Sequence, residues 1–219
     1  MSGSAPELLA YRQMHDETNV AAATLVALSE FERTPVPTNT RGQELEIHGL
    51  IQRGRFLEDR GLLLARALRY MAARGVRCEL RHDPGRTARL RERLHAEGCT
   101  QDLVFLEDLG RPGFQPLVLE HDLLAGSSLL LLEARAAFRR LPLHVLLVRP
   151  SPDGHALQIM NSLDGLNYSL SRDEVASHLN CPIHFGASYL AGGLYLFTGV
   201  AVRLGIENAP AAEHHAEQL

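Results

Sequence analysis

The sequence contains no lysine, so all 22 of its basic residues are arginine. This absence excludes mechanisms in which a lysine forms a Schiff base or attacks a substrate as a nucleophile. Acidic and basic residues nearly balance, with a formal net charge of -4 and a pI of about 6.3. Nothing in this balance points to nucleic acid or to an anionic membrane surface, so we expect neither as a partner.

Cysteine is also scarce. Cys78, Cys99 and Cys181 are widely spaced and form no C-x-x-C pair, so neither a zinc site nor a redox motif is predicted, and no cofactor is expected. Such sparse cysteine usage is typical of a reducing cytoplasm. The first residues, MSGSAPELLAYRQ, lack the features of a signal peptide. The longest apolar runs, such as SSLLLLEA, are much shorter than the ~20 residues of a membrane helix. We therefore expect a cytoplasmic protein without a membrane partner.

The spacing of apolar residues predicts mostly helices first and strands later. Helices are expected at 20–32, with Thr18 or Asn19 as the N-cap, and at 43–54, 58–74, 87–97 and 115–124, with one early strand at 76–80. Short apolar runs separated by turns predict antiparallel strands at 128–134, 144–150, 156–162, 166–171 and 195–204. A short helix is expected at 172–179, with Ser171 and Glu174 as a capping box. This order predicts a single α+β domain over 7–206, with flexible tails at 1–6 and 207–219.

The common catalytic and phosphate-binding motifs do not occur in the sequence. There is no G-x-x-x-x-G-K-[ST], G-x-G-x-x-G, H-E-x-x-H or G-x-S-x-G. His82-Asp83 precedes a proline and predicts a turn, whereas His121-Asp122 falls in a predicted helix and His214-His215 in the C-terminal tail. None of these pairs has partners at the spacing of metal ligands, so no metal site is predicted.

Four polar residues stand at positions that suit one site. Gln13 precedes Asn19 by six residues, and Asn19 opens a helix rich in alanine. His144 begins an apolar strand, and Asn161 ends the next one, just before a glycine turn. In this order the four residues resemble the papain-like cysteine peptidases, specifically the C39-like family. The resemblance covers 11–204 and implies a papain-like α+β fold, with a helical N-terminal half packed on an antiparallel sheet from the C-terminal half.

The resemblance implies a role for each position. Gln13 supplies an amide of the oxyanion hole, His144 is the general base, and Asn161 orients its imidazole. Asn19 stands where the family has its nucleophilic cysteine, and Val20 replaces the glycine that usually follows. A carboxamide does not titrate and is a poor nucleophile, whereas covalent catalysis needs a thiolate or an activated hydroxyl. We therefore expect no ordinary peptidase activity.

Two functions follow from the resemblance. The first is a C39-like domain without its nucleophile, which binds a peptide or an aminoacyl or acyl ligand without cleaving it. The second is an acyltransferase, cyclase or amidohydrolase in which His144 acts as general base toward a substrate amine or water. A chance match in an unrelated α+β domain stays open, and the four residues would then not converge. The apolar segment 187–204 could form a core strand or the interface of a homodimer.

Overall fold

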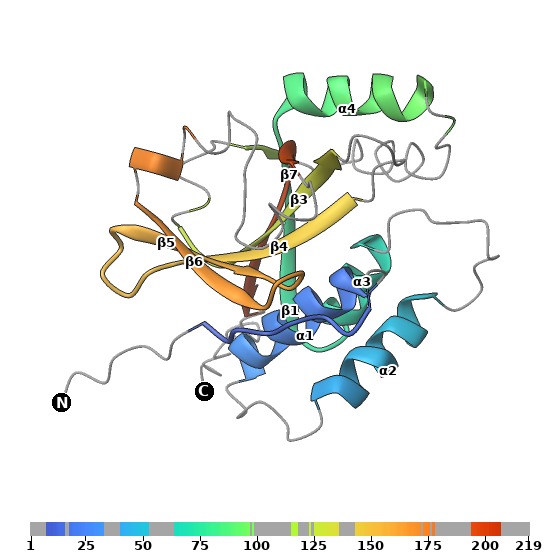
Figure 1. The fold of residues 1–219 in the computed structure, drawn as a ribbon, viewed down its shortest axis with the longest axis vertical. Coiled ribbons are helices and arrows are strands. Elements are labelled where there is room, and N and C mark those ends of the chain that lie inside the picture. The colour runs from blue at the N-terminus through green and yellow to red at the C-terminus, as the bar shows by residue number, and fades with distance from the viewer. Residues whose placement is uncertain are drawn as a thin grey trace, which may run out of the picture.

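One mixed β-sheet and four helices make up an α+β fold in the described part of the chain (Figure 1). The structure is a computed structural model. It describes residues 8–15, 18–32, 40–52, 64–96, 98, 115–117, 123, 125–135, 143–171, 173–175, 177 and 194–206. The predicted tails, Cys99 and Cys181, and the pairs His121-Asp122 and His214-His215 lie outside these residues.

Four helices are described in the structure. They are α1 (Asn19–Glu32), α2 (Thr40–Gln52), α3 (Leu64–Ala72) and α4 (Pro84–Ala96). The prediction at 20–32 is confirmed, and those at 43–54, 58–74 and 87–97 are confirmed for 43–52, 64–72 and 87–96. The turn predicted at His82-Asp83 is wrong. His82 ends a strand, and Asp83 caps α4 by accepting the N–H of Arg86 over 3.0 Å, with Pro84 in the first helical turn.

Seven strands form the sheet in the order β2-β1-β7-β3-β4-β5-β6. They are β1 (Val76–His82), β2 (Gln115–Pro116), β3 (Ser128–Arg135), β4 (Leu143–Pro150), β5 (Ala156–Asn161), β6 (Leu166–Ser171) and β7 (Leu194–Ile206). The strands β3 to β6 form the predicted antiparallel meander, and β7 lies between β1 and β3.

Two details of the predicted sheet are wrong. The helix predicted at 115–124 begins instead with β2, which pairs in parallel with β1, and the Leu117 N–H extends this pairing to the His82 carbonyl over 2.7 Å. Distant main-chain pairing overrides the local helical pattern there. The sheet is therefore mixed and not purely antiparallel, and β1 brings a strand of the N-terminal half into it.

Apolar side chains bury both faces of the sheet. Leu129 and Leu131 of β3 share a cluster with α1, α2 and α3, while Leu130 and Leu132 belong to a second cluster on the opposite face. This two-sided burial explains the uninterrupted leucines of β3. The strand β7 is paired on both sides, and its residues 200–202 are buried, so this part of the segment 187–204 is core. A homodimer stays a prediction.

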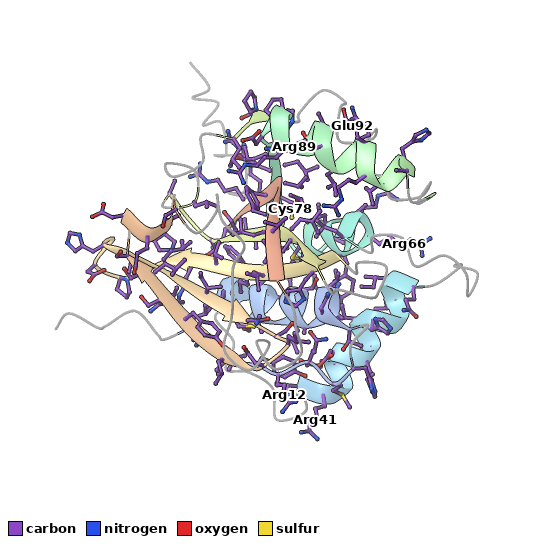
Figure 2. The ribbon with its side chains drawn as sticks, turned by 45° about the horizontal axis from the view of Figure 1, so that its top comes forward. Arg12, Arg41, Arg66, Cys78, Arg89 and Glu92 are labelled. Atoms are coloured by element: carbon purple, nitrogen blue, oxygen red, sulfur yellow. The ribbon has the colours of Figure 1, made fainter. Side chains whose placement is uncertain are left out.

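The extended segment 8–13 lies against the turn between β5 and β6. The Gln13 N–H donates to the Ser162 carbonyl over 2.8 Å, and the Asn167 side chain donates to the Leu8 carbonyl over 2.5 Å. Gly165 has a φ of 73°, and a Cβ added there would lie 2.6 Å from Cβ of Arg12. The labelled Arg12 in Figure 2 marks this end of the molecule, far from Arg89 and Glu92 on α4. No described helix has the length and apolarity needed to cross a bilayer.

Candidate functional site

The N-terminus of α1 places Asn19 beside the sheet. Thr18 is the N-cap, because its carbonyl accepts the N–H of Ala22 over 2.9 Å. The Thr18 hydroxyl points back along the chain, where it donates to the His15 carbonyl over 2.8 Å and accepts the His15 N–H over 3.1 Å. This local turn leaves Asn19 as the first helical residue, with its side chain directed at β4.

Pairing of β4 with β5 brings His144 and Asn161 together. The paired region ends with Leu147 opposite Met160, three residues after His144 and one residue before Asn161. The side chains of His144 and Asn161 meet just beyond this end of the pairing. His144 Nε2 is 2.9 Å from Asn161 Oδ1, and Asn161 Oδ1 also accepts the N–H of Leu163 over 3.1 Å.

Three of the four predicted residues form a continuous chain of hydrogen bonds. Asn19 Nδ2 lies 3.1 Å from His144 Nδ1, on the opposite side of the ring from Asn161. These residues are separated by 125 and 17 positions in the sequence, so only the tertiary fold brings them into contact. All three are buried, with exposed fractions of 7% for Asn19, 4% for His144 and 0% for Asn161.

Gln13 lies next to this chain but is held by other groups. Its Oε1 accepts the Ser162 hydroxyl over 2.7 Å, and its Nε2 donates to the His15 carbonyl over 2.8 Å. A carboxamide has two N–H bonds, and one of them is used in this way. Gln13 therefore ties the segment before α1 to the end of β5, and its role in an oxyanion hole stays a prediction.

Sequence analysis missed three residues that surround the site. Ser162 is fully buried and contacts Gln13, while Asp164 accepts Asn161 Nδ2 over 3.3 Å and the Tyr168 hydroxyl over 2.5 Å. The Leu166 N–H donates to the other oxygen of Asp164 over 3.0 Å. In the sequence, the Asp164-Gly165 pair indicated only a turn. The signal for the contact between Asn161 and Asp164 was their spacing of three residues across that turn.

The imidazole of His144 is neutral at pH 7. Burial lowers the pKa of His144 to about 4, because the interior disfavours the charged ring more than Asn161 and Asp164 favour it. Since Nε2 faces a carbonyl oxygen, it carries the proton, and Nδ1 accepts the hydrogen bond from Asn19. Burial and the adjacent Asp164 carboxylate raise the pKa of Tyr168, so its phenol stays protonated and donates.

The described residues contain no cluster of three or more His, Cys, Asp or Glu side chains that could hold a metal ion. Burial raises the pKa of the Cys78 thiol to about 11, which keeps it protonated and unreactive at neutral pH. Cys78 on β1 is partly buried and packs against the core. The absence of a cofactor stays a prediction.

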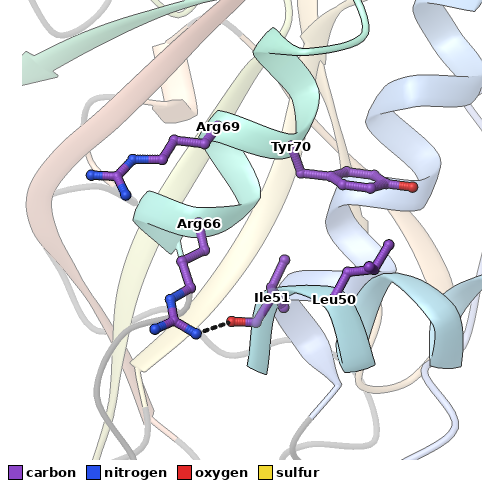
Figure 3. A pocket seen from close by; sticks show the side chains of 5 residues that line it. All are labelled: Leu50, Ile51, Arg66, Arg69 and Tyr70. Atoms are coloured by element: carbon purple, nitrogen blue, oxygen red, sulfur yellow. Dashed lines mark hydrogen bonds between the residues drawn. The ribbon is translucent and has the colours of Figure 1, made fainter. Parts of the chain in front are cut away.

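A separate pocket of about 270 Å³ lies between α2 and α3 (Figure 3). It is lined by Leu50, Ile51, Arg66, Arg69 and Tyr70. Arg66 donates to the Ile51 carbonyl over 3.0 Å, so a cation stabilises the C-terminus of α2. None of the residues of the hydrogen-bonded chain lines this pocket.

Comparison of the chain with protein-family models, curated proteins and solved structures returned no match.

Proposed function

We propose that the chain is a papain-like, C39-like domain that lacks the nucleophile and binds a peptide or an acyl or aminoacyl ligand without cleaving it. The carrying observation is the contact of His144 with Asn19 through Nδ1 and with Asn161 through Nε2. A nucleophile, a base and a group that orients the base are arranged in this way in covalent hydrolases. Here the first position of that arrangement is a carboxamide at the start of a buried helix.

The chemistry of the three groups argues against covalent cleavage. Asn19 has no proton whose removal would yield a nucleophile at neutral pH. His144 is neutral, and its Nδ1 lone pair already accepts a hydrogen bond from Asn19. Thr18, the nearest hydroxyl in the sequence, is turned toward His15. The arrangement therefore keeps the geometry of a triad without a group that can attack.

The same groups suit the recognition of an uncharged, hydrogen-bonding ligand. Asn19 and Gln13 contribute carboxamides, and His144 contributes a neutral ring. A peptide bond, a primary amide or an acyl carbonyl can exchange its hydrogen bonds with water for bonds to such groups. A buried charged ligand would lack a counter-charge among them and would be disfavoured.

The binding proposal is tested with short peptides blocked by N-acetyl and C-amide groups, screened by thermal unfolding and confirmed by isothermal titration. We expect binding that falls at least tenfold in Asn19→Ala and His144→Ala. Thr198→Ala is the matched control, because it also removes a buried hydrogen-bonding side chain. The Thr198 hydroxyl in β7 donates to the Leu131 carbonyl over 2.7 Å. Peptide cleavage that depends on His144 would contradict the proposal, as would binding that survives both substitutions.

The papain-like assignment has its own test in Asn19→Cys. A thiol at the start of α1 and beside His144 should have a lowered pKa, because the helix N-terminus favours a thiolate and the neutral His144 can accept the thiol proton to form an ion pair. Alkylation at that position, followed by peptide mass spectrometry, should be faster at pH 6–7 than in the double variant Asn19→Cys with His144→Ala. Mapping separates this thiol from Cys78, Cys99 and Cys181. Equal rates in the two variants would show that the geometry does not act as a triad.

The second candidate is an enzyme that uses His144 as a general base, and one observation favours it. The proton on Nε2 leaves Nδ1 as the basic atom, facing the start of α1. General-base catalysis contributes typically ~10²–10⁴-fold, but a pKa near 4 makes this ring a weak base. Turnover of acyl esters or amides that is lost in His144→Ala, and that levels off above pH 5, would support this candidate over binding alone.

A further inference from the structure

The imidazole of His144 lies between the carboxamides of Asn19 and Asn161, and two different sets of hydrogen bonds are consistent with this arrangement. In the first, Asn161 turns Oδ1 toward Nε2, the ring is protonated on Nε2, and Nδ1 accepts from Asn19. In the second, both carboxamides are rotated by half a turn and the proton lies on Nδ1. Asn19, His144 and Asn161 alone do not distinguish these networks, because the two ends of a carboxamide have nearly the same shape.

Asp164 and the main-chain N–H of Leu163 both make the two networks unequal. A carboxylate can only accept hydrogen bonds, and Asn161 Nδ2 lies 3.3 Å from Asp164 Oδ2. Rotation of the Asn161 carboxamide would bring its carbonyl oxygen against this carboxylate. It would also turn Nδ2 toward the Leu163 N–H, which now donates to Oδ1 over 3.1 Å. The rotated network thus replaces two hydrogen bonds with two contacts between like partial charges.

The carboxylate of Asp164 is itself held in place through both oxygens. The Tyr168 hydroxyl donates to Oδ2 over 2.5 Å, and the Leu166 N–H donates to Oδ1 over 3.0 Å. Both donors come from β6, the strand that follows the turn. The raised pKa of the Tyr168 phenol keeps this donor protonated throughout the neutral range. Asp164 is therefore a fixed acceptor at the end of the chain of hydrogen bonds.

We propose that Asp164, anchored by Tyr168, is the positioning residue that sets the tautomer of His144 and the orientation of the Asn19 carboxamide. Because Asn19 gives Nδ2 to His144, its Oδ1 is turned away from the ring.

The tautomer is measured directly by long-range ¹H–¹⁵N NMR of histidine side chains. The signals of His144 are identified among the 11 histidines by their loss in His144→Gln. We expect a protonated Nε2 and an unprotonated Nδ1 in the wild type, and a substantial Nδ1-protonated population in Asp164→Asn. Tyr168→Phe should produce a smaller population of the same kind. Asp153→Asn is the matched control, since Asp153 also accepts hydrogen bonds within a tight turn but lies in the β4–β5 connection.

The outcomes separate the two proposals. An Nδ1-protonated ring in the wild type would overturn this inference and the site geometry on which the proposed function rests. A wild-type ring protonated on Nε2, with an unchanged ring in both Asp164→Asn and Tyr168→Phe, would overturn the role of Asp164 alone. If Asp164→Asn does not fold, an unchanged ring in Tyr168→Phe overturns it. A tautomer change in Asp153→Asn as large as in Asp164→Asn would also contradict it.

Discussion

Replacing Gly165 with alanine should disrupt the contact between the site and the segment before α1. Gly165 has a φ of 73°, a conformation that costs an L-residue about 1–2 kcal/mol. The added Cβ would also lie 2.6 Å from Cβ of Arg12 and 3.1 Å from its Cα and N, so main chain must move. Overpacking of this kind costs about 1–3 kcal/mol. The two terms together predict a destabilisation of about 2–5 kcal/mol.

Gly154→Ala is the internal control for the backbone term. Gly154 has a φ of 70° in the turn between β4 and β5, but an added Cβ there meets nothing within 4 Å. This variant should lose only the cost of the left-handed conformation, about 1–2 kcal/mol. The gain from restricting the unfolded chain is the same in both variants and cancels in the comparison. The difference of about 1–3 kcal/mol then isolates the collision with Arg12.

Urea unfolding at a constant m-value measures this difference. With m near 2 kcal/mol/M, the midpoints of the two variants should lie roughly 0.5–1.5 M apart. Hydrogen exchange adds a local measurement, because the Gln13 N–H donates to the Ser162 carbonyl at the same contact. Its protection should fall in Gly165→Ala and persist in Gly154→Ala. Equal midpoints, with Gln13 protection unchanged, would refute the packing of segment 8–13 on this turn.

Three further predictions concern buried groups. Arg149→Ala should destabilise the fold by about 3–5 kcal/mol, because Arg149 pairs with Glu30 over 2.6 Å and both side chains are largely buried. Adding Glu30→Gln should recover part of this loss in urea unfolding. Losses that simply add in the double variant would contradict the prediction. The pKa of His144 is about 4 in the folded protein against 6.5 unfolded, so lowering the pH from 6.5 to 4 protonates mainly the unfolded state. The free energy of unfolding should therefore fall by on the order of 3 kcal/mol between pH 6.5 and pH 4. This fall should be absent in His144→Gln, and parallel curves of stability against pH for the two proteins would contradict the prediction. With a pKa raised to about 11, the partly buried Cys78 should react with an alkylating reagent more slowly at pH 8 in the folded protein than in urea. Equal rates at Cys78 in the two conditions, measured by peptide mapping, would contradict this prediction.

Local pattern was enough to predict most elements of the fold. The alanine-rich run after Asn19 and the leucine runs at 128–134 and 144–150 lie where the structure has α1, β3 and β4. Their character depends on short-range preferences and on burial, which the sequence carries at each position. The failures fall at 115–117 and at His82-Asp83, where main-chain pairing with a distant strand or a capping carboxylate decides the outcome.

The order of Gln13, Asn19, His144 and Asn161 was sufficient to select these residues, but not to assign their contacts. Asn161 and Asp164 are three residues apart, and their contact depends on the turn that Gly165 permits. Gln13 was expected to face a ligand, whereas two of its hydrogen bonds join neighbouring parts of the chain. Such contacts depend on side-chain direction and strand register, which residue spacing does not encode.

By itself, the sequence determined the chemistry that this protein can use. It has no lysine, and it places the carboxamide of Asn19 at the start of the alanine-rich helix, and those identities do not change on folding. Tertiary structure decided what those groups do. Pairing of β4 with β5 and packing of α1 bring Asn19, His144 and Asn161 within 3.1 Å of their neighbours, and burial keeps the imidazole neutral. A pKa and a tautomer depend on surroundings assembled from distant parts of the chain, so only the folded protein sets them.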